Sequence, residues 1–388
     1  MALSETILTV VRELLPPQRP IGLHEPSFGE RDKALTQDCL DSGWVSSVGR
    51  YVDQFEQGLA ELTGIPHAVA TVNGTAALHT CLMVAGVRAG DEILLPALTF
   101  VGTANPVAAM GAVPHFVDCD RDTLGVDPQV LEVYLRQIAE LRDGVCYNRH
   151  SGRPLRALVV VHVLGHVADM PALRSIADDY GLCLIEDAAE ALGSYRDNLH
   201  AGHWGDLAAL SFNGNKIITT GGGGAILTRN DELAARARHL TTTAKRPHPW
   251  ALEHDAVGFN YRLPNLNAAL GCAQLEQLPQ RLAQKRRLAE RYAAAFAGLK
   301  DVELYPEPSG CRSNHWLNLL LLPDNSERES LLSAAHAEDI LMRPFWTPLH
   351  RLPMYQDNPC APLQISEDLF ARGVCLPSSA ALANSEAA

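Results

Sequence analysis

Lys216 is the residue whose type and position best suit chemistry, because it stands in a run of small and polar residues from Ser211 to Gly224. The apolar run from Leu207 to Phe212 has the composition of a buried strand, so the lysine is expected on a tight turn just past a strand end. Lysines usually lie on solvated faces, and one beside a core strand is a candidate amine nucleophile. The alternative is an ordinary loop lysine whose glycines serve only the turn.

Three other segments with chemical potential are also expected at strand ends. Gly74 and Thr75 follow an apolar run and open a helix, where unpaired backbone N–H groups could cradle a phosphate or could simply belong to a capped helix start. Asp187 follows another apolar run, and a buried aspartate needs a cationic or donor partner unless it caps the next turn. Phe100 could stack on a flat ligand or could be a core side chain.

These four positions together match the requirements of one cofactor, pyridoxal 5'-phosphate. It needs a lysine for its Schiff base, an anion-binding turn for its phosphate, an acid beside its pyridine nitrogen and a flat wall against its ring. Each requirement finds a candidate at an expected strand end. A protonated ring nitrogen accepts electron density when the substrate loses a proton, and an ionised Asp187 would hold that proton in place.

Strands and helices are expected to alternate over the first two thirds of the chain. The strand-like runs are 68–72, 92–95, 115–117, 157–163, 183–185, 207–212 and 225–228, and the helix-like runs are 75–85, 101–110, 170–180 and 231–240. This alternation predicts a mostly parallel sheet covered by helices, with ligands at the carboxyl ends of its strands. The more polar segment 123–156 is expected to decorate this domain.

The character of the chain changes around residues 241–265, where several prolines break the pattern. We therefore predict an N-terminal arm and large cofactor-binding domain over residues 1–245, and a smaller C-terminal α/β domain over 246–388. Residues 266–299 have a helical composition with an expected interruption near Pro279.

Composition excludes several classes of protein. The 388 residues are 47% hydrophobic, enough for a large core, and the net charge of −13 argues against nucleic acid as a partner. Nine cysteines without a CxxC pair indicate reduced thiols in a cytoplasm and no metal site. The chain is expected to have no signal peptide and no membrane-spanning segment.

Several longer motifs give the chain a specific resemblance. It resembles the DegT-type sugar-nucleotide aminotransferases of fold type I, in the aspartate aminotransferase superfamily. The matching stretches follow the family's order over nearly the whole chain: 73–78, 90–96, 185–193, 211–224, 258–263 and 267–269. The resemblance implies a three-layer α/β/α large domain and a homodimer with shared active sites.

The resemblance also implies a role for each matching residue. Lys216 would form the Schiff base with pyridoxal phosphate, and Asp187 would pair with the pyridine nitrogen. Other matching residues would bind the phosphate or cover the two faces of the ring: Gly74, Thr75 and Ser211 for the phosphate, Phe100 and Ala189 for the faces. Asn260 would reach the phosphate from the neighbouring subunit. Arg262 would lie near the substrate, with an exposed, solvated arginine as the alternative.

Glu190 departs from the wider family, in which many relatives have glutamine beside the phenolic oxygen of the cofactor. An ionised carboxylate would repel a phenolate, so Glu190 must be protonated, displaced or directed at another partner. The phrase 186–194 is nevertheless similar to the branch called LegC-like, as are the segments 23–28, 43–49 and 343–350.

That branch implies amino transfer from glutamate to C4 of a UDP-linked 2-acetamido-2,6-dideoxy-4-keto sugar, for a surface glycan or a legionaminic-acid-like product. Transamination of a 3-keto sugar or a cyclitol, and a non-enzymatic regulator that binds the cofactor, remain alternatives. Family members that dehydrate the sugar carry histidine at the lysine position, which Lys216 argues against.

Two further patterns could suggest a different nucleotide-binding function, but both are weaker evidence than the motifs above. Asp118, Asp120 and Asp122 imitate the DxD motif of a metal-dependent glycosyltransferase, but turn-forming and capping aspartates are the better interpretation. The glycines at 221–224 do not form a dinucleotide-binding fingerprint.

The remaining candidates are side chains that could line a sugar pocket. Ser47, Trp44, Trp316 and Trp346 could shape it, with core packing as the default for the tryptophans. The four most suggestive histidines are expected to be structural or substrate-lining rather than catalytic: His162, His166, His315 and His350.

Overall fold

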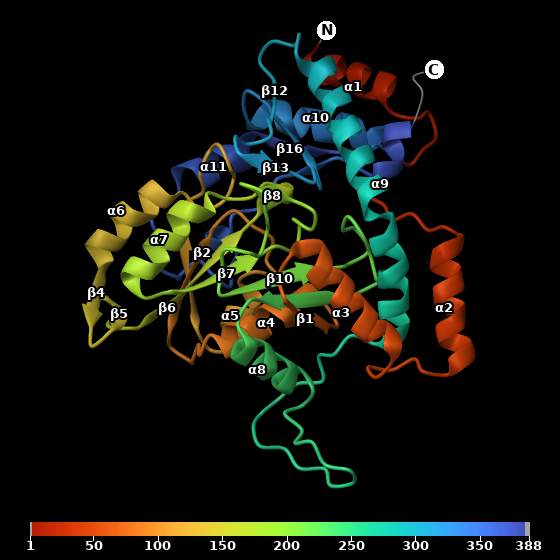
Figure 1. The fold of residues 1–388 in the computed structure, drawn as a ribbon. Helices are drawn as coiled ribbons and strands as arrows, with labels where there is room; N and C mark the ends of the chain where they lie inside the picture. The colour runs from red at the N-terminus through yellow and green to blue at the C-terminus, as the bar shows by residue number, and fades with distance from the viewer. Residues whose placement is uncertain (1, 385–388) are drawn as a thin grey trace.

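A seven-stranded sheet forms the centre of the computed structural model, which describes residues 2–384 (Figure 1). Its strand order is β1-β11-β10-β7-β6-β2-β3. Every neighbouring pair is parallel except the two pairs that β11 makes with β1 and β10. The predicted mostly parallel sheet is confirmed. The strands are β1 (His67–Thr71), β2 (Glu92–Pro96), β3 (Val113–Val117), β6 (Leu155–Val161), β7 (Cys183–Asp187), β10 (Leu207–Ser211) and β11 (Gly224–Thr228).

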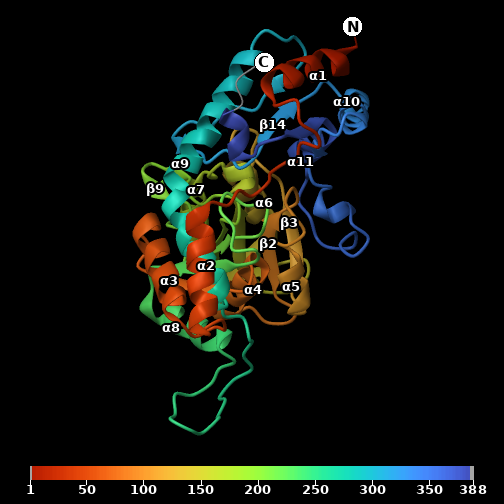
Figure 2. The same ribbon diagram turned by 90° about the vertical axis from the view of Figure 1, so that its right-hand side faces the viewer.

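Helices cover both faces of this sheet, giving the three layers visible in Figures 1 and 2. Successive side chains of a strand point to opposite faces. Ile93 and Leu95 of β2 accordingly join one apolar cluster, and Leu94 joins the other. The first cluster includes side chains of α4 (Gly74–Val84), α5 (Asn105–Ala109) and α8 (Asp231–Thr241). The second includes side chains of α3 (Arg50–Thr63), α6 (Pro128–Ile138) and α7 (Met170–Tyr180).

A smaller four-stranded sheet, in the order β12-β14-β16-β15, lies against one end of the large one. Leu320 of β14 packs among side chains of the flanking helices, whereas Leu319 packs in a cluster with Leu98 and Val161 of the large unit. One face of the small sheet is therefore turned toward the large sheet. Its elements are β12 (Glu303–Leu304), β14 (Asn318–Leu321), β15 (Arg343–Pro344) and β16 (Gly373–Leu376), with α1 (Leu3–Leu14), α10 (Asn325–Ala337) and α11 (Gln364–Arg372).

The long helix α9 (Asn265–Phe296) connects the two units. Its first part packs against α2 (Glu30–Ser42) and α3, and its last part lies in the apolar cluster of α1 and the small sheet. The expected interruption near Pro279 is wrong, because the helix continues through this residue. Pro279 is exposed, so its ring faces solvent while Leu278 remains buried in the core.

The division of the chain after residue 245 stays a prediction. Helix α1 belongs to the predicted large domain by sequence, yet its side chains Ile7 and Leu8 pack with the small unit. The last four residues of the predicted small domain lie outside the described residues.

The remaining elements are short. The segment 123–156 contains α6 and a hairpin, β4 (Ala139–Arg142) with β5 (Val145–Asn148). A second small sheet joins β8 (Tyr195–Arg196), β9 (Leu199–His200) and β13 (Cys311–Arg312). The helix expected from residue 101 begins only at Asn105, with Pro106 in its first turn, where the missing N–H costs no helical bond. Short 3-10 turns occur at Val163–Gly165, Leu349–Arg351 and Ala380–Asn384.

Between α8 and α9, the chain leaves the body of the molecule as a long projecting segment (Figures 1 and 2). Among residues 2–384, no helix combines the length and apolar character that crossing a membrane requires.

Candidate active site

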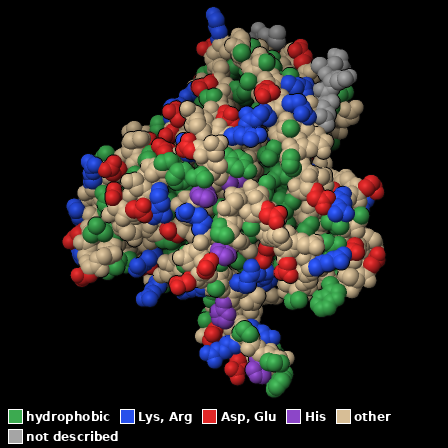
Figure 3. Space-filling model, viewed as in Figure 1, with side chains coloured by type: hydrophobic (Ala, Val, Ile, Leu, Met, Phe, Trp, Pro, Cys, Tyr) green, Lys and Arg blue, Asp and Glu red, His purple; other side chains and the backbone are tan. Residues whose placement is uncertain are grey.

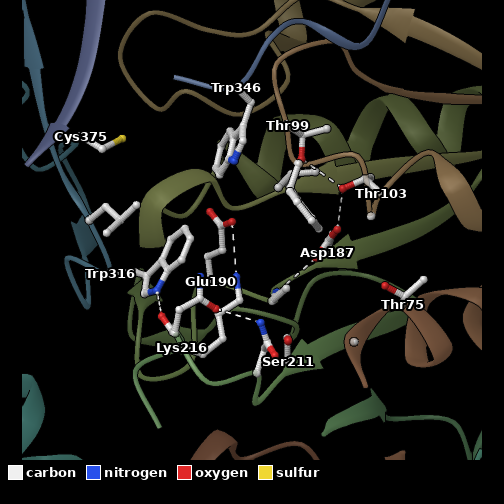
Figure 4. Close-up of a pocket in the computed structure, with 18 of the residues that line it drawn as sticks. Thr75, Thr99, Thr103, Asp187, Glu190, Ser211, Lys216, Trp316, Trp346 and Cys375 are labelled. Atoms are coloured by element: carbon white, nitrogen blue, oxygen red, sulfur yellow. Dashed lines mark hydrogen bonds and ion pairs between the residues drawn. The ribbon is translucent and has the colours of Figure 1, made fainter. Parts of the chain in front are cut away.

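The strand ends of the large sheet and one edge of the small unit enclose a cavity of about 620 Å³. Side chains that follow β2, β7 and β10 line it from the large sheet, and Trp316 and Trp346 line it from the small unit (Figure 4). The carboxyl ends of parallel strands are the usual place for ligands in such sheets. A set of residues widely separated in sequence thus meets in one enclosed space.

Lys216 points into this cavity rather than into solvent, and only 13% of its side chain is exposed. It follows β10 on a tight turn in which its own N–H donates to the carbonyl of Asn213 at 3.0 Å. Its Nζ lies 3.5 Å from Oε1 of Glu190 and 4.0 Å from the centre of the Trp316 ring. An acid and an aromatic face therefore surround the amine, as expected for a positioned lysine and not for an ordinary loop lysine.

Asp187 is the last residue of β7 and is buried at the floor of the cavity. Its Oδ2 accepts a hydrogen bond from the Thr103 hydroxyl at 2.8 Å, and its Oδ1 accepts one from the N–H of Ala189 at 3.2 Å. Burial raises the pKa of Asp187, while the hydrogen bond from Thr103 opposes that rise. A cationic group placed beside this carboxylate would therefore be bound strongly.

Glu190 is a second buried acid that lines the cavity. Burial raises its pKa to about 7, and the nearby Lys216 ammonium partly opposes the shift. Its Oε2 accepts a hydrogen bond from the backbone N–H of Leu164 at 2.8 Å. Of the three possibilities raised by the sequence, the structure supports a carboxyl whose pKa burial raises and whose Oε1 faces Lys216.

The N-terminus of α4 opens toward the same cavity. Asn73 caps the helix, because its Oδ1 accepts from the N–H of Ala76 at 2.7 Å. The cap leaves the N–H groups of Gly74 and Thr75, in the first turn, without acceptors inside the helix. A Cβ at Gly74 would lie 2.8 Å from Cβ of Ser211, so only glycine allows this close approach. The capping interpretation is confirmed, and it is compatible with anion binding at the same helix start.

Most of the predicted site residues line the cavity, including Phe100, whose side chain is 56% exposed, Ala189 and Trp346. Four do not line the cavity of their own chain. Trp44 is 61% exposed, so core packing, the default expected for it, is wrong. Ser47 lies in the loop before α3, and Asn260 is exposed at the base of the projecting segment. Arg262 is buried, with 7% exposed, and its Nη1 is 2.7 Å from Oε1 of Glu56. The alternative of a solvated Arg262 is wrong, and the proposed substrate contacts of Ser47 and Arg262 stay predictions.

The sequence interpretation overlooked Thr103, the hydroxyl donor to Asp187. Its hydroxyl lies 3.1 Å from that of Thr99, and Figure 4 shows this chain of contacts reaching Asp187. Two threonines four residues apart directly after a strand gave a usable signal, because buried hydroxyls need partners. Arg343, Asn213 and Asn215 also line the cavity without having been selected as site residues.

Two of the four histidines and the first aspartate of the DxD-like sequence have clear structural partners. His162 Nε2 is 2.7 Å from Oε2 of Glu186, and both side chains are fully buried. His350 pairs with Glu367 at 2.9 Å. Asp118 accepts hydrogen bonds from the N–H groups of Ile365 and Ser366, at 2.9 and 2.8 Å. These bonds support the structural interpretation of His162 and His350 and the capping interpretation of the DxD-like sequence, whereas Nδ1 of His166 is buried without a hydrogen-bond partner among the described residues.

The donors and acids of the cavity fit pyridoxal phosphate. The glycine-limited start of α4, with the Ser211 hydroxyl beside it, suits a phosphate. Buried Asp187 suits a protonated ring nitrogen, and Lys216 supplies the amine that would bond to the aldehyde. The residues of this chain thus offer a partner to each end of the cofactor.

Comparisons with known proteins agree with this geometry. Residues 26–388 match the model of the DegT/DnrJ/EryC1/StrS aminotransferase family. The chain is 35% identical to GDP-perosamine synthase of Vibrio cholerae, over 92% of this chain and 94% of the relative. It is also 35% identical to the putative pyridoxal phosphate-dependent aminotransferase EpsN of Bacillus subtilis (strain 168), over 95% and 93% of the two chains.

A solved structure extends the match to three dimensions. The crystal structure of DesI, analysed in the presence of its TDP-sugar product, superposes with a TM-score of 0.82 at 30% identity and covers 93% of this chain and 88% of its own. The family match spans nearly the whole chain, including every residue that lines the cavity apart from Leu23. The chain therefore belongs to the DegT/DnrJ/EryC1/StrS family of pyridoxal phosphate-dependent aminotransferases, with the fold type I architecture.

Proposed function

We propose that this protein transfers an amino group from glutamate to the keto carbon of a nucleotide-linked 4-keto-6-deoxy sugar. The observation that carries the proposal is the meeting of Lys216, Asp187 and the start of α4 in one cavity. The similarity to a GDP-perosamine synthase and to DesI, solved with its TDP-sugar product, supports a sugar nucleotide as the acceptor. Pyridoxal phosphate, when bound, supplies the electron sink for the proton loss at the donor's α-carbon.

The side chains of the cavity divide the remaining work. Nζ of Lys216 takes the proton from the α-carbon of glutamate and returns a proton to the sugar in the second half of the reaction. Asp187 holds the proton on the ring nitrogen, and the N–H groups of Gly74 and Thr75 with the Ser211 hydroxyl bind the phosphate. Phe100 covers one face of the cofactor ring, and Ala189 covers the other. Because one lysine serves both halves, donor and acceptor follow ping-pong kinetics.

The proposed acceptor is UDP-2-acetamido-2,6-dideoxy-4-hexulose, and the product feeds a surface glycan or a legionaminic-acid-like sugar. The support is the similarity of segments 186–194 and 343–350 to the LegC-like branch. Trp346 and Trp316 lie nearly parallel beside Lys216, with an interplanar angle of 14°, and offer apolar faces to a sugar ring. We also propose Ser47 and Arg262 as substrate contacts. Because neither lines the cavity of its own chain, each would contact the substrate only in the assembled homodimer.

Mass analysis of reaction products tests this function. The protein is incubated with glutamate and a panel of UDP-, GDP- and TDP-linked 4-keto sugars, and 2-oxoglutarate is measured in parallel. We expect an amino sugar from the UDP-linked acetamido substrate and an equal amount of 2-oxoglutarate. Lys216→Ala should abolish both half-reactions, and substantial turnover by this variant would refute the role of Lys216.

Other outcomes would point to a different function. If every 4-keto sugar fails, 3-keto sugars and cyclitols are tested next, and amination of one of these would replace the acceptor while keeping the chemistry. Failure to form 2-oxoglutarate from the cofactor-loaded protein would favour a regulator that binds the cofactor without turnover.

We also propose that the protein acts as a homodimer with shared active sites, in which Asn260 of each subunit reaches the phosphate site of the other. The support is a set of large apolar side chains left exposed in the single chain. Trp250 is 82% exposed on the projecting segment, which extends from the body at the bottom of Figure 3. The others are near α2 or on the same segment: Phe28, Leu40, Trp44, Val45, Val48, Leu252 and Val257. Exposed apolar surface of this kind marks interfaces.

We place the protein in the cytoplasm. All nine cysteines lie within residues 2–384, and each of them is a free thiol in the structure. Free thiols persist in reducing compartments. Measuring the thiol content of the purified protein with and without reductant would check this placement.

A further inference from the structure

The amine of Lys216 lies between a carboxyl group and the face of an aromatic ring. Oε1 of Glu190 is 3.5 Å away, and the face of the Trp316 ring is 4.0 Å away on the small-unit side (Figure 4). A carboxylate attracts an ammonium directly, and an indole face attracts it through the ring quadrupole. Glu190 and Trp316 thus form a receptacle for the Nζ of Lys216 in its protonated state, which the lysine enters each time it takes up a proton.

Glu190 is directed toward Lys216 by an unusual backbone turn. Leu164 is fully buried and has a φ of 57°, in the left-handed region that non-glycine residues rarely adopt. Its N–H donates to Oε2 of Glu190 at 2.8 Å. Backbone strain of this kind concentrates at functional sites, where surrounding structure holds it in place. Here the turn gives one oxygen of Glu190 a fixed donor and leaves the other oxygen facing Lys216.

Asn314 fixes the positions of Glu190 and Trp316 relative to each other. Its Nδ2 donates to the carbonyls of Glu190 and Leu192, at 2.8 and 2.9 Å, and its Oδ1 accepts from the N–H of Trp316 at 2.8 Å. Trp316 Nε1 donates in turn to the carbonyl of Asn215 at 2.7 Å, directly before the lysine. A continuous series of hydrogen bonds therefore connects the backbone of Glu190, through Asn314 and Trp316, to the residue before Lys216.

The titratable groups that face Glu190 come from three elements. Lys216 lies on the turn after β10, Asp187 lies at the end of β7, and the thiol of Cys375 lies on β16. Burial raises the pKa of Glu190 to about 7, the ammonium of Lys216 opposes the rise, and the negative charge of Asp187 adds to it. A carboxyl that titrates near neutral pH can both accept and return a proton under working conditions.

We propose that Glu190 is a second catalytic group, which takes a proton from the ammonium of Lys216 and returns it later in the same turnover. An N–H bond at Nζ of Lys216 breaks and an O–H bond forms at Oε1 of Glu190, leaving a neutral amine and a neutral carboxylic acid; the return step reverses this. No electrons are gained or lost, and no further reactant is needed. The inference rests on the proposed function of Lys216 and goes beyond the expected contact of Glu190 with the cofactor's phenolic oxygen.

The first test follows covalent attachment of pyridoxal phosphate to Lys216 in the cofactor-free full chain, by absorbance, as a function of pH. Attachment requires a neutral amine, and a neighbouring carboxylate favours the ammonium. In Glu190→Gln we therefore expect the midpoint of the attachment rate to fall by about one pH unit. Glu307→Gln is the matched control, because this partly buried carboxylate lies outside the cavity beside His315. Its midpoint should equal that of the wild type.

Two results have separate meanings. If the wild type attaches the cofactor but Glu190→Gln has the same midpoint, the proton exchange is refuted while the proposed function stands. If the wild-type lysine does not attach the cofactor at all, the proposed function itself is refuted.

The second test measures the glutamate half-reaction of the loaded protein in single-turnover experiments between pH 6 and pH 9. The wild-type rate should rise through roughly pH 7, as Glu190 ionises and becomes able to accept the proton. In Glu190→Gln this rise of the rate near pH 7 should be absent. The variant should react about 10²-fold more slowly than the wild type at pH 8, with an unchanged affinity for glutamate. Glu190→Asp should retain the rise. A purely structural Glu190 would leave the shape of the pH profile unaltered in Glu190→Gln, and that result would overturn the proposal.

Discussion

The hydroxyl of Thr103 and the N–H of Ala189 each donate to a different oxygen of Asp187. Burial raises the pKa of this aspartate, so it needs such donors to remain ionised. At the scale of single residues, the acid expected to anchor the cofactor thus depends on a threonine 84 positions earlier in the chain. The same is true of Glu190, whose carboxylate depends on the N–H of Leu164.

Thr103→Val should weaken cofactor binding about 10-fold, because a hydrogen bond to a charged group contributes roughly 1.5 kcal/mol and valine keeps the shape of threonine. The measurement is the dissociation constant of pyridoxal phosphate, from absorbance titration at pH 7.5. Thr99→Val is the matched control, since Thr99 contacts Thr103 but has no bond to Asp187, and it should have a smaller effect. Equal affinities for the wild type and Thr103→Val would show that Asp187 does not need this donor.

At the scale of helices and strands, α9 is the element that joins the two units. Its early turns pack on α2 and α3, and its late residues Leu288, Tyr292 and Phe296 lie in the core of the small unit. A proline normally ends or kinks a helix, because it lacks an N–H and crowds the preceding turn. Pro279 does not end this one, because tertiary packing on both sides holds the helix together.

Pro279→Ala should raise the free energy of unfolding by about 1 to 3 kcal/mol, since alanine restores the helical hydrogen bond and the side chain is exposed. The gain is reduced by the greater freedom of the unfolded chain without proline. Urea denaturation would measure it. Gln280→Ala, at the exposed neighbouring position, should change stability by less than about 0.5 kcal/mol. A less stable Pro279→Ala would mean that the proline fits a local distortion that α9 requires.

At the scale of the whole molecule, the residues proposed for the active site lie in two separate places on the chain. Lys216, Asp187 and the start of α4 meet in one cavity, whereas Asn260 lies exposed and does not line it. The projecting segment next to Asn260 carries Trp250, Leu252 and Val257 into solvent. These features suit a symmetric pair in which each subunit covers the apolar surface of the other and completes its site.

Mixing two defective variants tests this arrangement. Lys216→Ala should be inactive, and Asn260→Ala should be poorly active at limiting cofactor. Reassembled in equal amounts, they should recover about a quarter of wild-type activity, because half of the dimers are mixed and each mixed dimer has one intact site. Activity no higher than that of the two variants measured separately would exclude a site shared through Asn260.

Local patterns in the sequence were sufficient to predict the main architecture. Apolar runs bounded by glycine and polar residues located the strands of the parallel sheet, and the residues just past them supplied Lys216, Asp187 and Gly74 as site candidates. These signals are local, because strand periodicity, turn residues and helix starts extend over a few neighbouring positions. The roles assigned to those residues remain predictions that the experiments above address.

Tertiary structure alone decided which distant groups meet. No local pattern links Thr103 to Asp187, Leu164 to Glu190 or Arg262 to Glu56, because each pair is joined by packing of separate elements. The same limit explains why a proline was expected to interrupt α9, since propensity describes a segment alone while burial on both sides of Pro279 decides its outcome. The sequence can single out Lys216 as the candidate amine, but only the folded chain determines which acid and which aromatic ring lie beside it.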